Sequence, residues 1–356
     1  MGIMGNLLIL LLCSLCLYLF VALVKVLHKP WWTPIRMQYL MTSQGIKGPP
    51  YRFIHGNTKE IFNKIKETSD RPMNLSNDIF STVEPHIYEW KNKYGKNFLQ
   101  WHGPQAVLVV TEPELIIEIL NNKDRAYPKG KVNRCVKKLL GDGLVKSKGE
   151  KWAKMRKLAN YAFHGESLKL LPAMVDSAKT ILGRGSKKGS DPVIQKEDPN
   201  PEDIARLKTM TMIINESIRL HPPVIGFDRE VARKIKLGKL ILPANLHLRI
   251  RNLALNHDPQ LWGEDVNYFR PERFSQRIAK ATNNNTAAFF PFGNGPRTCV
   301  GLNFALNETK IVLSMILQRY SFTLSPSYTH SPVRVLTIRP EHGIQIMLHS
   351  LNSEEK

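Results

Sequence analysis

The sequence predicts a mainly α-helical protein with small β-sheets, an α+β fold class, behind one apolar N-terminal segment. Three observations lead to this prediction. Apolar residues recur at helical spacing in several segments, short alternating runs flanked by glycine and proline lie between them, and residues 1–24 carry no charge. With 356 residues, of which 42% are hydrophobic, the chain is long enough to form a sizeable core.

The N-terminal segment, residues 1–24, predicts a retained membrane anchor. Leu7 to Val24 is a nearly continuous apolar run, long enough to cross a bilayer. Every basic residue follows this run and no acid precedes Glu60, which places the N-terminus in the lumen and the rest of the chain in the cytosol. The alternative interpretation is a buried core helix.

Residues 25–50 are expected to form a hinge. Pro30 and Pro34, followed by the Gly48 to Pro50 run, predict that a helix cannot continue through this stretch. The tryptophans Trp31 and Trp32 suit the membrane interface.

The first half of the remaining chain predicts a hairpin and three helices. They are a hairpin from Phe98–Trp101 and Ala106–Val110, a helix near 112–120, a helix that carries Trp152 and Arg156, and an amphipathic helix that ends near Leu182. Because Trp152 and Arg156 are four residues apart, they share one helix face. The polar stretch 183–203, rich in glycine and charge, has the composition of a flexible linker.

The second half predicts two further helices and short strands. A helix stops at Pro222, the segment 235–242 is expected to form a hairpin, an apolar helix follows Cys299, and the tail from 321 to 351 is expected to form short strands. The helix after Cys299 is apolar over most of its circumference, so we expect it to be buried.

One cysteine lies in a glycine-punctuated loop directly before that apolar helix. Cys13, Cys16, Cys135 and Cys299 are too few and too scattered for a disulfide framework. The loop reads F-x-x-G-x-R-x-C-x-G, with the fixed residues Phe292, Gly295, Arg297, Cys299 and Gly301. Glycines let the backbone approach a flat cofactor, and helical N–H groups stabilise a thiolate. A buried structural cysteine is the alternative, but this pattern arises by chance in roughly one in ten thousand such sequences.

With this loop the chain resembles the cytochrome P450 family of haem-thiolate monooxygenases. The pattern Trp32-x-Pro34-x-Arg36 followed by the 44–51 segment is similar to plant members of clan 72. The resemblance implies the cofactor haem b with Cys299 as the iron ligand. It also implies that Trp152, Arg156 and Arg297 contact the haem propionates and that Phe292 packs near the thiolate.

The resemblance further implies a buried charge network. Glu216 and Arg219 form an E-x-x-R pair, and Arg273 lies in the motif Phe269-Arg-Pro-Glu-Arg-Phe274. These three residues are expected to pin the segment that leads to the cysteine loop. Substrate contacts are expected from Val224–Phe227 and Tyr328–Val333.

The resemblance has one large gap. No A/G-G-x-D/E-T-T pattern, the family's distal acid-threonine pair, occurs in the chain, and only 63 positions separate Arg156 from Arg219. We therefore expect a cytochrome P450 fold that lacks the central distal helices. Residues 51–182 would be its N-terminal part, 183–203 the junction at an internal deletion, and 204–356 its haem-binding C-terminal part. No catalytic residue is identified.

The expected function is monooxygenation, the insertion of one oxygen atom from O2 into a small lipophilic substrate, with activity absent or badly impaired. The alternative is a non-catalytic haem-binding or interaction remnant. The net charge of +21 calls for acidic partners. The resemblance implies NADPH-cytochrome P450 reductase and membrane lipid at the endoplasmic reticulum, with residues 1–24 as a single-pass anchor. A nucleic-acid binder explains the charge but neither the anchor nor the cysteine loop, so no nucleic-acid partner is expected.

Overall fold

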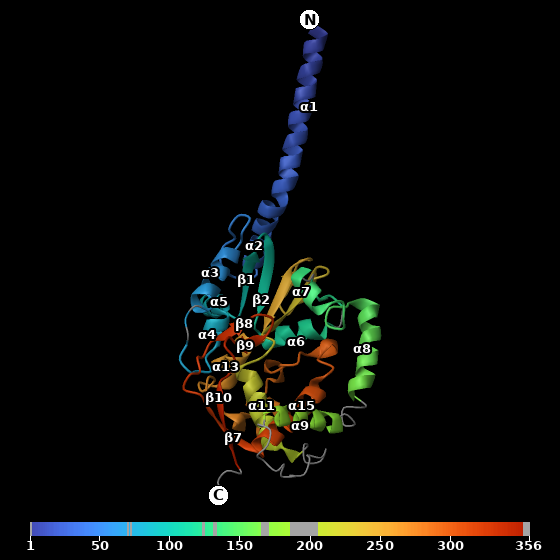
Figure 1. The fold of residues 1–356 in the computed structure, drawn as a ribbon. Coiled ribbons are helices and arrows are strands. Elements are labelled where there is room, and N and C mark those ends of the chain that lie inside the picture. Colours follow the sequence, from blue (N-terminus) through green and yellow to red (C-terminus); the bar gives the residue numbers. More distant parts are fainter. Residues whose placement is uncertain are drawn as a thin grey trace.

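The computed structural model describes residues 2–351 apart from 70, 72, 123–124, 131–133, 165–170 and 186–205. It confirms the predicted class, since helices surround small β-sheets (Figure 1). One long helix projects from this body and carries the N-terminus at its far end.

The projecting helix continues where a hinge was predicted. Helix α1 (Gly2–Leu27) passes through a π-helical turn (His28–Trp32) into α2 (Thr33–Thr42). The prediction that the prolines stop the helix is therefore wrong. Pro34 lies in the first turn of α2, where a missing N–H is tolerated, and the wider π-turn accommodates Pro30. Among the described residues, one helical stretch, Ile9–Thr42, is long and apolar enough to cross a membrane.

A four-stranded sheet forms the centre of the body, in the order β1-β2-β6-β3. The predicted hairpin is present as β1 (Asn97–His102) and β2 (Gln105–Val110). The sequence reading missed β3 (Gly226–Glu230) and β6 (His247–Arg251). Parallel pairing of β2 with β6 joins parts of the chain on either side of the 183–203 junction.

Alternation along the strands gives the sheet two buried faces. Phe98 and Val109 point to a core formed with α3 (Thr58–Ser69), α4 (Phe80–Val83) and α5 (Pro85–Tyr94). Trp101 and Leu108 point to the opposite core, which includes α6 (Pro113–Asn121). The sheet is therefore the platform between the N-terminal helices and the segments that carry the cysteine loop.

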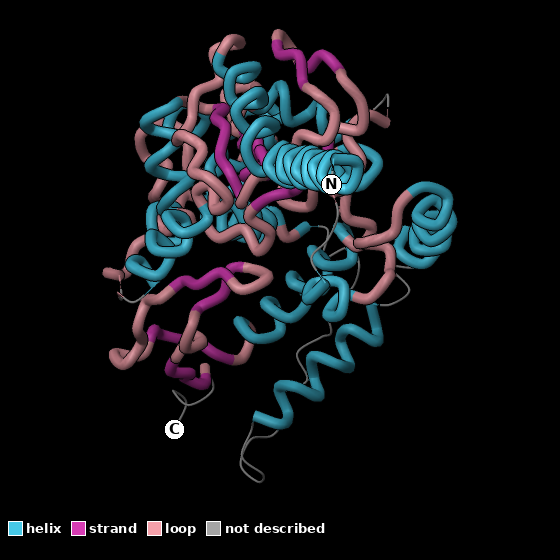
Figure 2. The backbone as a smooth tube through the Cα atoms, turned by 90° about the horizontal axis from the view of Figure 1, so that it is seen from above, coloured by secondary structure: helices cyan, strands magenta, loops and turns pink. Residues whose placement is uncertain are grey.

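The described helices between α6 and the second half of the sheet are α7 (Arg134–Leu140), α8 (Gly149–His164), α9 (Leu171–Gly185) and α11 (Lys208–Leu220). Seen from above, α8 stands at the rim of the molecule (Figure 2). The predicted linker lies mostly outside the described residues, because only 183–185 are seen, at the end of α9.

The helix after Cys299, α15 (Leu302–Leu317), is less buried than expected. It packs against α9 through Ile311 and Met315, which meet Met174, Val175 and Ala178. Among its residues only Ile311 and Met315 are buried. The apolar circumference of α15 suits burial, and the described residues cover only part of it.

Short elements complete the body. The predicted hairpin at 235–242 is present as β4 (Ile235–Leu237) and β5 (Leu240–Leu242). Between it and the cysteine loop lie α12 (Asn252–Asn256), α13 (Pro259–Trp262) and α14 (Ile278–Ala281), and two short 3-10 turns, Pro271–Phe274 and Thr286–Ala288. The predicted terminal strands are β7 (Tyr320–Leu324), which pairs with β10 (Ile346–Ser350), and β8 (Pro332–Arg334), which pairs with β9 (Ile338–Pro340).

Candidate functional site

The cysteine loop is a compact turn that presents an exposed thiol. The backbone N–H of Cys299 donates to the carbonyl of Phe292 over 2.8 Å, which closes the loop. A 3-10 turn, Gly295–Arg297, lies inside it, and α15 begins three residues after the cysteine. The side chain of Cys299 is exposed. Its sulfur is thus accessible at the N-terminal end of a 16-residue helix, where a negative charge is favoured.

The loop requires glycine at two positions, of which the sequence reading identified one. Gly295 has φ +74°, and a Cβ there would lie 2.6 Å from the Leu120 carbonyl oxygen at the end of α6. Gly293, which was missed, has φ +80°. Gly301 has φ −91°, which any residue adopts, and a Cβ there would lie 3.6 Å from the Phe163 ring, an ordinary van der Waals contact. The protein's own packing therefore explains Gly295 but not Gly301.

The structure brings Trp152 of α8 and Arg297 of the loop together. The Arg297 guanidinium lies over the Trp152 ring, 4.1 Å from its centroid. It also donates to the Ser147 carbonyl oxygen over 3.0 Å. A cation over an indole ring is stabilised by the ring's negative face. The start of α8 is thereby attached to the loop two residues before Cys299.

Arg156, one turn further along α8, binds the same loop. Its guanidinium donates to the carbonyl of Thr298, and its Nε donates to the Asn160 side-chain oxygen over 2.8 Å. Trp152, Arg156 and Arg297, which come from two distant segments, therefore surround the backbone next to Cys299.

These cations crowd one another. Burial, and then the neighbouring charges of Arg229 and Arg156, lower the pKa of Arg297 to about 10. Burial, followed by Arg297, Arg229 and Lys146, lowers the pKa of Lys129 to about 8. Such mutual depression marks a place where an anion would be favourable. A cofactor with two carboxylates and a thiolate-bound metal fits this donor set.

Sequence reasoning missed Arg229 and Lys129 as members of this cluster. Arg229 lies on β3, two residues after Phe227 and on the same face of the strand, and the Phe227 ring lies 6.3 Å from the Phe290 ring between centroids. Phe227 also lies 3.6 Å from the Cβ position of Gly293. Recognition of β3 as a strand would have placed Arg229 on the face toward the loop.

Glu216, Arg219 and Arg273 also meet. Arg219 binds both carboxylate oxygens of Glu216, at 2.7 and 2.8 Å, and both side chains are fully buried. Arg273 Nε lies 3.4 Å from Glu216 Oε1, and its other nitrogens bind the carbonyls of Trp262 and Asp265. The carboxylate of Glu216 thus links α11 to the 262–273 segment.

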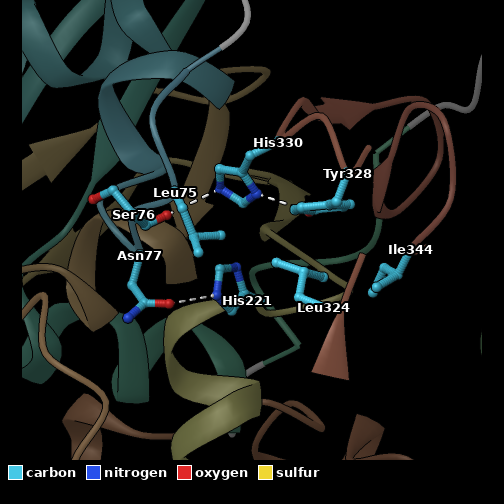
Figure 3. Close-up of a pocket in the computed structure, with 8 residues that line it drawn as sticks. All are labelled: Leu75, Ser76, Asn77, His221, Leu324, Tyr328, His330 and Ile344. Atoms are coloured by element: carbon cyan, nitrogen blue, oxygen red, sulfur yellow. Dashed lines mark hydrogen bonds between the residues drawn. The ribbon is translucent and has the colours of Figure 1, made fainter. Parts of the chain in front are cut away.

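A separate pocket of about 270 Å³ lies between the start of the body and its C-terminal strands (Figure 3). His330 bridges the Tyr328 hydroxyl, at 2.8 Å, and the Ser76 carbonyl oxygen, at 3.0 Å. Across the pocket, His221 contacts Asn77 at 3.1 Å, and burial lowers the pKa of His221 to about 4. Two members of the expected substrate segment, Tyr328 and His330, line this pocket, whereas none of the residues predicted to bind haem does.

Comparison with known proteins identifies the family. The sequence model described as Cytochrome P450 matches residues 81–192 and 186–347. The chain belongs to the cytochrome P450 family. Cytochromes P450 are oxidoreductases that act as monooxygenases, and their iron is held in haem by a cysteine thiolate.

The relatives confirm the predicted plant type. The chain is 39% identical to Cytochrome P450 CYP749A22 of Panax ginseng, over 96% of this chain and 97% of that protein. It is 29% identical to Cytochrome P450 72A397 of Kalopanax septemlobus, over 92% and 95%. Among solved structures, retinoic acid-bound cyanobacterial CYP120A1 has a TM-score of 0.65 at 17% identity, covering 77% of this chain and 96% of that one. This likeness confirms the P450 fold.

The alignments contain a large internal gap. The ginseng relative aligns over 507 positions, but this chain has only 356 residues, so more than a quarter of the aligned positions have no residue here. The two family matches meet at 186–192, inside the predicted junction 183–203. The chain therefore covers both ends of its relatives without the part between them.

Proposed function

We propose that this chain binds haem b through Cys299, in the proximal half of a cytochrome P450. The observation that carries the proposal is the exposed Cys299 thiol in a loop that Arg156 of α8 binds at Thr298 and from which Arg297 binds the Ser147 carbonyl. Trp152, Arg156 and Arg297, joined by Arg229 and Lys129, would hold the two propionates. Gly295 and Gly301 would allow close approach of the loop to the ring, and Phe292 would pack beside the sulfur.

A thiolate-bound haem, when present, supplies dioxygen binding and favours O–O cleavage. This chain's own part would be to hold Cys299 in place and to fix the haem carboxylates. The hydrogen bond from the Cys299 backbone N–H to the Phe292 carbonyl and the bond from Arg156 to the Thr298 carbonyl position the loop around the sulfur. The ion pairs of the cations with the carboxylates would hold the ring in one orientation.

We further propose that oxygen insertion into a small lipophilic substrate is absent or strongly impaired. The family delivers protons to bound oxygen with an acid-threonine pair that this sequence does not contain. Loss of positioned proton transfer alone typically lowers rates by about 10²–10⁴-fold. The internal gap removes the whole segment in which the pair would lie.

The second candidate function, a non-catalytic haem-binding or interaction remnant, is favoured by one observation. Helix α15 buries only Ile311 and Met315, although it is apolar around most of its circumference. An incompletely covered helix behind the cysteine suits a protein that keeps the cofactor-binding half without the reaction chamber.

The two candidates differ in a paired experiment. The reduced, carbon monoxide-bound spectrum of the purified chain is compared with that of Cys299→Ser, with Cys16→Ser as the matched control. We expect a thiolate-type Soret band that is lost in Cys299→Ser and kept in Cys16→Ser. A chain without haem would contradict haem binding through Cys299 and leave only an interaction remnant. Turnover of a lipophilic substrate with added reductase would contradict both the proposed impairment and the non-catalytic remnant.

We propose that residues 1–24 anchor the chain as a single pass in the endoplasmic reticulum membrane, with the body in the cytosol. The exposed apolar helix and the basic residues that follow it support this orientation. The electron donor would be NADPH-cytochrome P450 reductase, drawn by the net charge of +21, and nucleic acid would not be a partner. Reductase binding that weakens with salt supports this, and equally strong DNA binding would contradict it.

We also propose that Glu216, Arg219 and Arg273 serve haem retention indirectly. Their contacts hold the 262–273 segment, which leads into the cysteine loop. The parts at 51–182 and 204–356 would then act as one haem domain across the junction at 183–203, because strands β2 and β6 pair directly.

A further inference from the structure

The pocket in Figure 3 is a hollow of about 270 Å³ between three segments that are distant in the sequence. Residues 75–77 precede α4, His221 directly follows α11, and the remaining lining residues belong to β7 and to the chain after it. A cavity of roughly 150 Å³ is enough to hold benzene. The pocket therefore has room for a substituted ring.

Three aliphatic side chains form the apolar wall of the pocket. Leu75, Leu324 and Ile344 are 71%, 40% and 60% exposed. A ligand that lay against them would remove this apolar surface from water, which is favourable. Sites for small molecules have such a composition, with mostly apolar walls and a few placed polar groups.

The hydrogen bonds of His330 determine which of its nitrogens carries the proton. Nε2 lies 3.0 Å from the Ser76 carbonyl oxygen, which can only accept, so the proton is on Nε2. Nδ1 then accepts from the Tyr328 hydroxyl over 2.8 Å. Both nitrogens of His330 are thus used within the protein, and the Tyr328 hydroxyl has donated its one proton.

His221 has one nitrogen left for a ligand. The Asn77 amide donates through Nδ2 to the Asn267 carbonyl oxygen over 3.3 Å, which leaves its Oδ1 to accept from His221. Nε2 of His221 lies 3.1 Å from that oxygen and therefore carries the proton, so Nδ1 has a bare lone pair. The described residues supply no hydrogen bond to this Nδ1. Figure 3 shows the His221 ring among the lining side chains, across the pocket from His330.

The surroundings keep the His221 ring uncharged. Burial, followed by the neighbouring His257, His330 and Arg219, lowers the pKa of His221 to about 4. At neutral pH its Nδ1 is therefore a hydrogen-bond acceptor and not a donor. The polar side of the pocket thus calls for a ligand that donates.

We propose that this pocket binds a small uncharged molecule with a ring-sized apolar body and one hydroxyl group, such as a phenol, whose O–H donates to Nδ1 of His221. The apolar body would lie against Leu75, Leu324 and Ile344. The site goes beyond haem binding and does not depend on it, since none of the residues proposed to hold haem lines the pocket.

An ionic ligand fits this pocket less well. None of the described residues that line it is an acid, a lysine or an arginine, so neither an anion nor an organic cation would find a counter-charge. The described part of the chain also contains no group of three His, Cys, Asp or Glu side chains that could hold a metal ion.

The test titrates the full-length chain in phospholipid nanodiscs with para-fluorophenol, observed by fluorine NMR. Empty nanodiscs measure the part that enters lipid. In para-fluoroanisole a methyl group replaces the donated proton, and we expect it to bind roughly three- to tenfold more weakly. Equal binding of the two probes would overturn the hydrogen bond to His221, and binding no greater than to empty nanodiscs would overturn the site.

Two variants locate the bound probe. Leu324→Trp should abolish binding, because the larger ring fills the hollow, whereas Leu348→Trp, on an exposed position outside the pocket, should leave it unchanged. His221→Gln keeps an N–H for Asn77 but lacks Nδ1, so it should weaken binding of the phenol and leave binding of the anisole unchanged. Undiminished phenol binding in Leu324→Trp would place the probe elsewhere and contradict the proposal.

The same titration separates this inference from the proposed haem site. Cys299 lies outside the pocket, so Cys299→Ser should bind para-fluorophenol as tightly as the unaltered chain does. Loss of phenol binding in Cys299→Ser would show that the probe binds at the haem and would overturn the pocket. A chain that binds no haem but still binds the phenol would overturn the haem proposal alone.

Discussion

The Arg297 guanidinium lies 4.1 Å from the centre of the Trp152 ring, two residues before the exposed Cys299. The family resemblance predicts that both side chains reach the carboxylates of a haem, and in the structure each is already held by the other. The contact ties α8 to the cysteine loop.

Replacement of Arg156 by alanine should weaken haem retention. Its guanidinium binds the Thr298 carbonyl next to Cys299 and would pair with a propionate. A hydrogen bond to a charged group contributes about 1.5–3 kcal/mol, so loss of this one should raise haem dissociation roughly tenfold. The measurement is haem transfer to an excess of apomyoglobin. Lys154→Ala, on an exposed position of the same helix, is the control, and equal rates in both variants would refute the role of Arg156.

Glu216→Gln should destabilise the fold strongly. The carboxylate is fully buried and binds Arg219 in two places, so its loss leaves the buried Arg219 without its counter-charge, whereas Arg273 keeps its ion pair with Asp265. Removing one partner of a buried pair costs about 3–5 kcal/mol. Urea unfolding monitored by circular dichroism measures this change in the free energy of unfolding. The exposed Glu272→Gln should be close to neutral, and a similarly mild effect at Glu216 would contradict the network.

Alanine at the two loop glycines should act differently. At Gly295 the backbone has φ +74°, and the new methyl group would lie 2.6 Å from a backbone oxygen, so Gly295→Ala should cost about 1–3 kcal/mol in the apoprotein. At Gly301, with φ −91° and open packing, the same change should stay within about 0.5 kcal/mol. Apoprotein melting temperatures compare the two variants. Equal destabilisation by Gly295→Ala and Gly301→Ala would contradict the backbone conformation described for the loop.

The stability of the protein should fall below pH 6.5 partly because of His102. Burial, and then the nearby Arg249 and Arg251 charges, lower the pKa of this imidazole to about 4. Between pH 6.5 and about 4 the unfolded chain binds a proton that the folded chain does not, so the stability is present above pH 6.5 and decreases as the pH falls. His102→Gln should make this decrease shallower in urea unfolding at pH 4.5, 5.5 and 7.0. The exposed His55→Gln is the control, and an unchanged slope in His102→Gln would contradict the assignment.

Much of the site follows from contiguous patterns. The loop from Phe292 to Gly301 and the pair Trp152 and Arg156 each lie within one short segment, so their spacing alone predicts that they act together. Their contacts with each other cross about 140 positions of sequence, and only the family resemblance predicted them. The structure brings them together through Arg297 and Thr298.

The missed residues depend on distant pairing. Arg229 lies on β3, which pairs with β6, and the backbone next to Lys129 meets the same strand because the Glu230 N–H donates to the Pro128 carbonyl, a topology that no local pattern reveals. The cluster is therefore a product of the sheet. From the sequence alone, Arg229 cannot be distinguished from a solvent-exposed arginine.

One expectation failed for an identifiable physical reason. The prolines at 30 and 34 do not end the helix, because one falls in a π-helical turn and the other in the first turn of α2. Helix α15 has an apolar circumference that suits burial, but the described part of the chain covers it only partly.

Helix α1 continues through the π-helical turn into α2, so the N-terminal segment leaves the body as one helical rod and not as an irregular linker. Met41 at the end of α2 is fully buried in the core, so the direction in which the N-terminal helix leaves the body is set by the packing of α2.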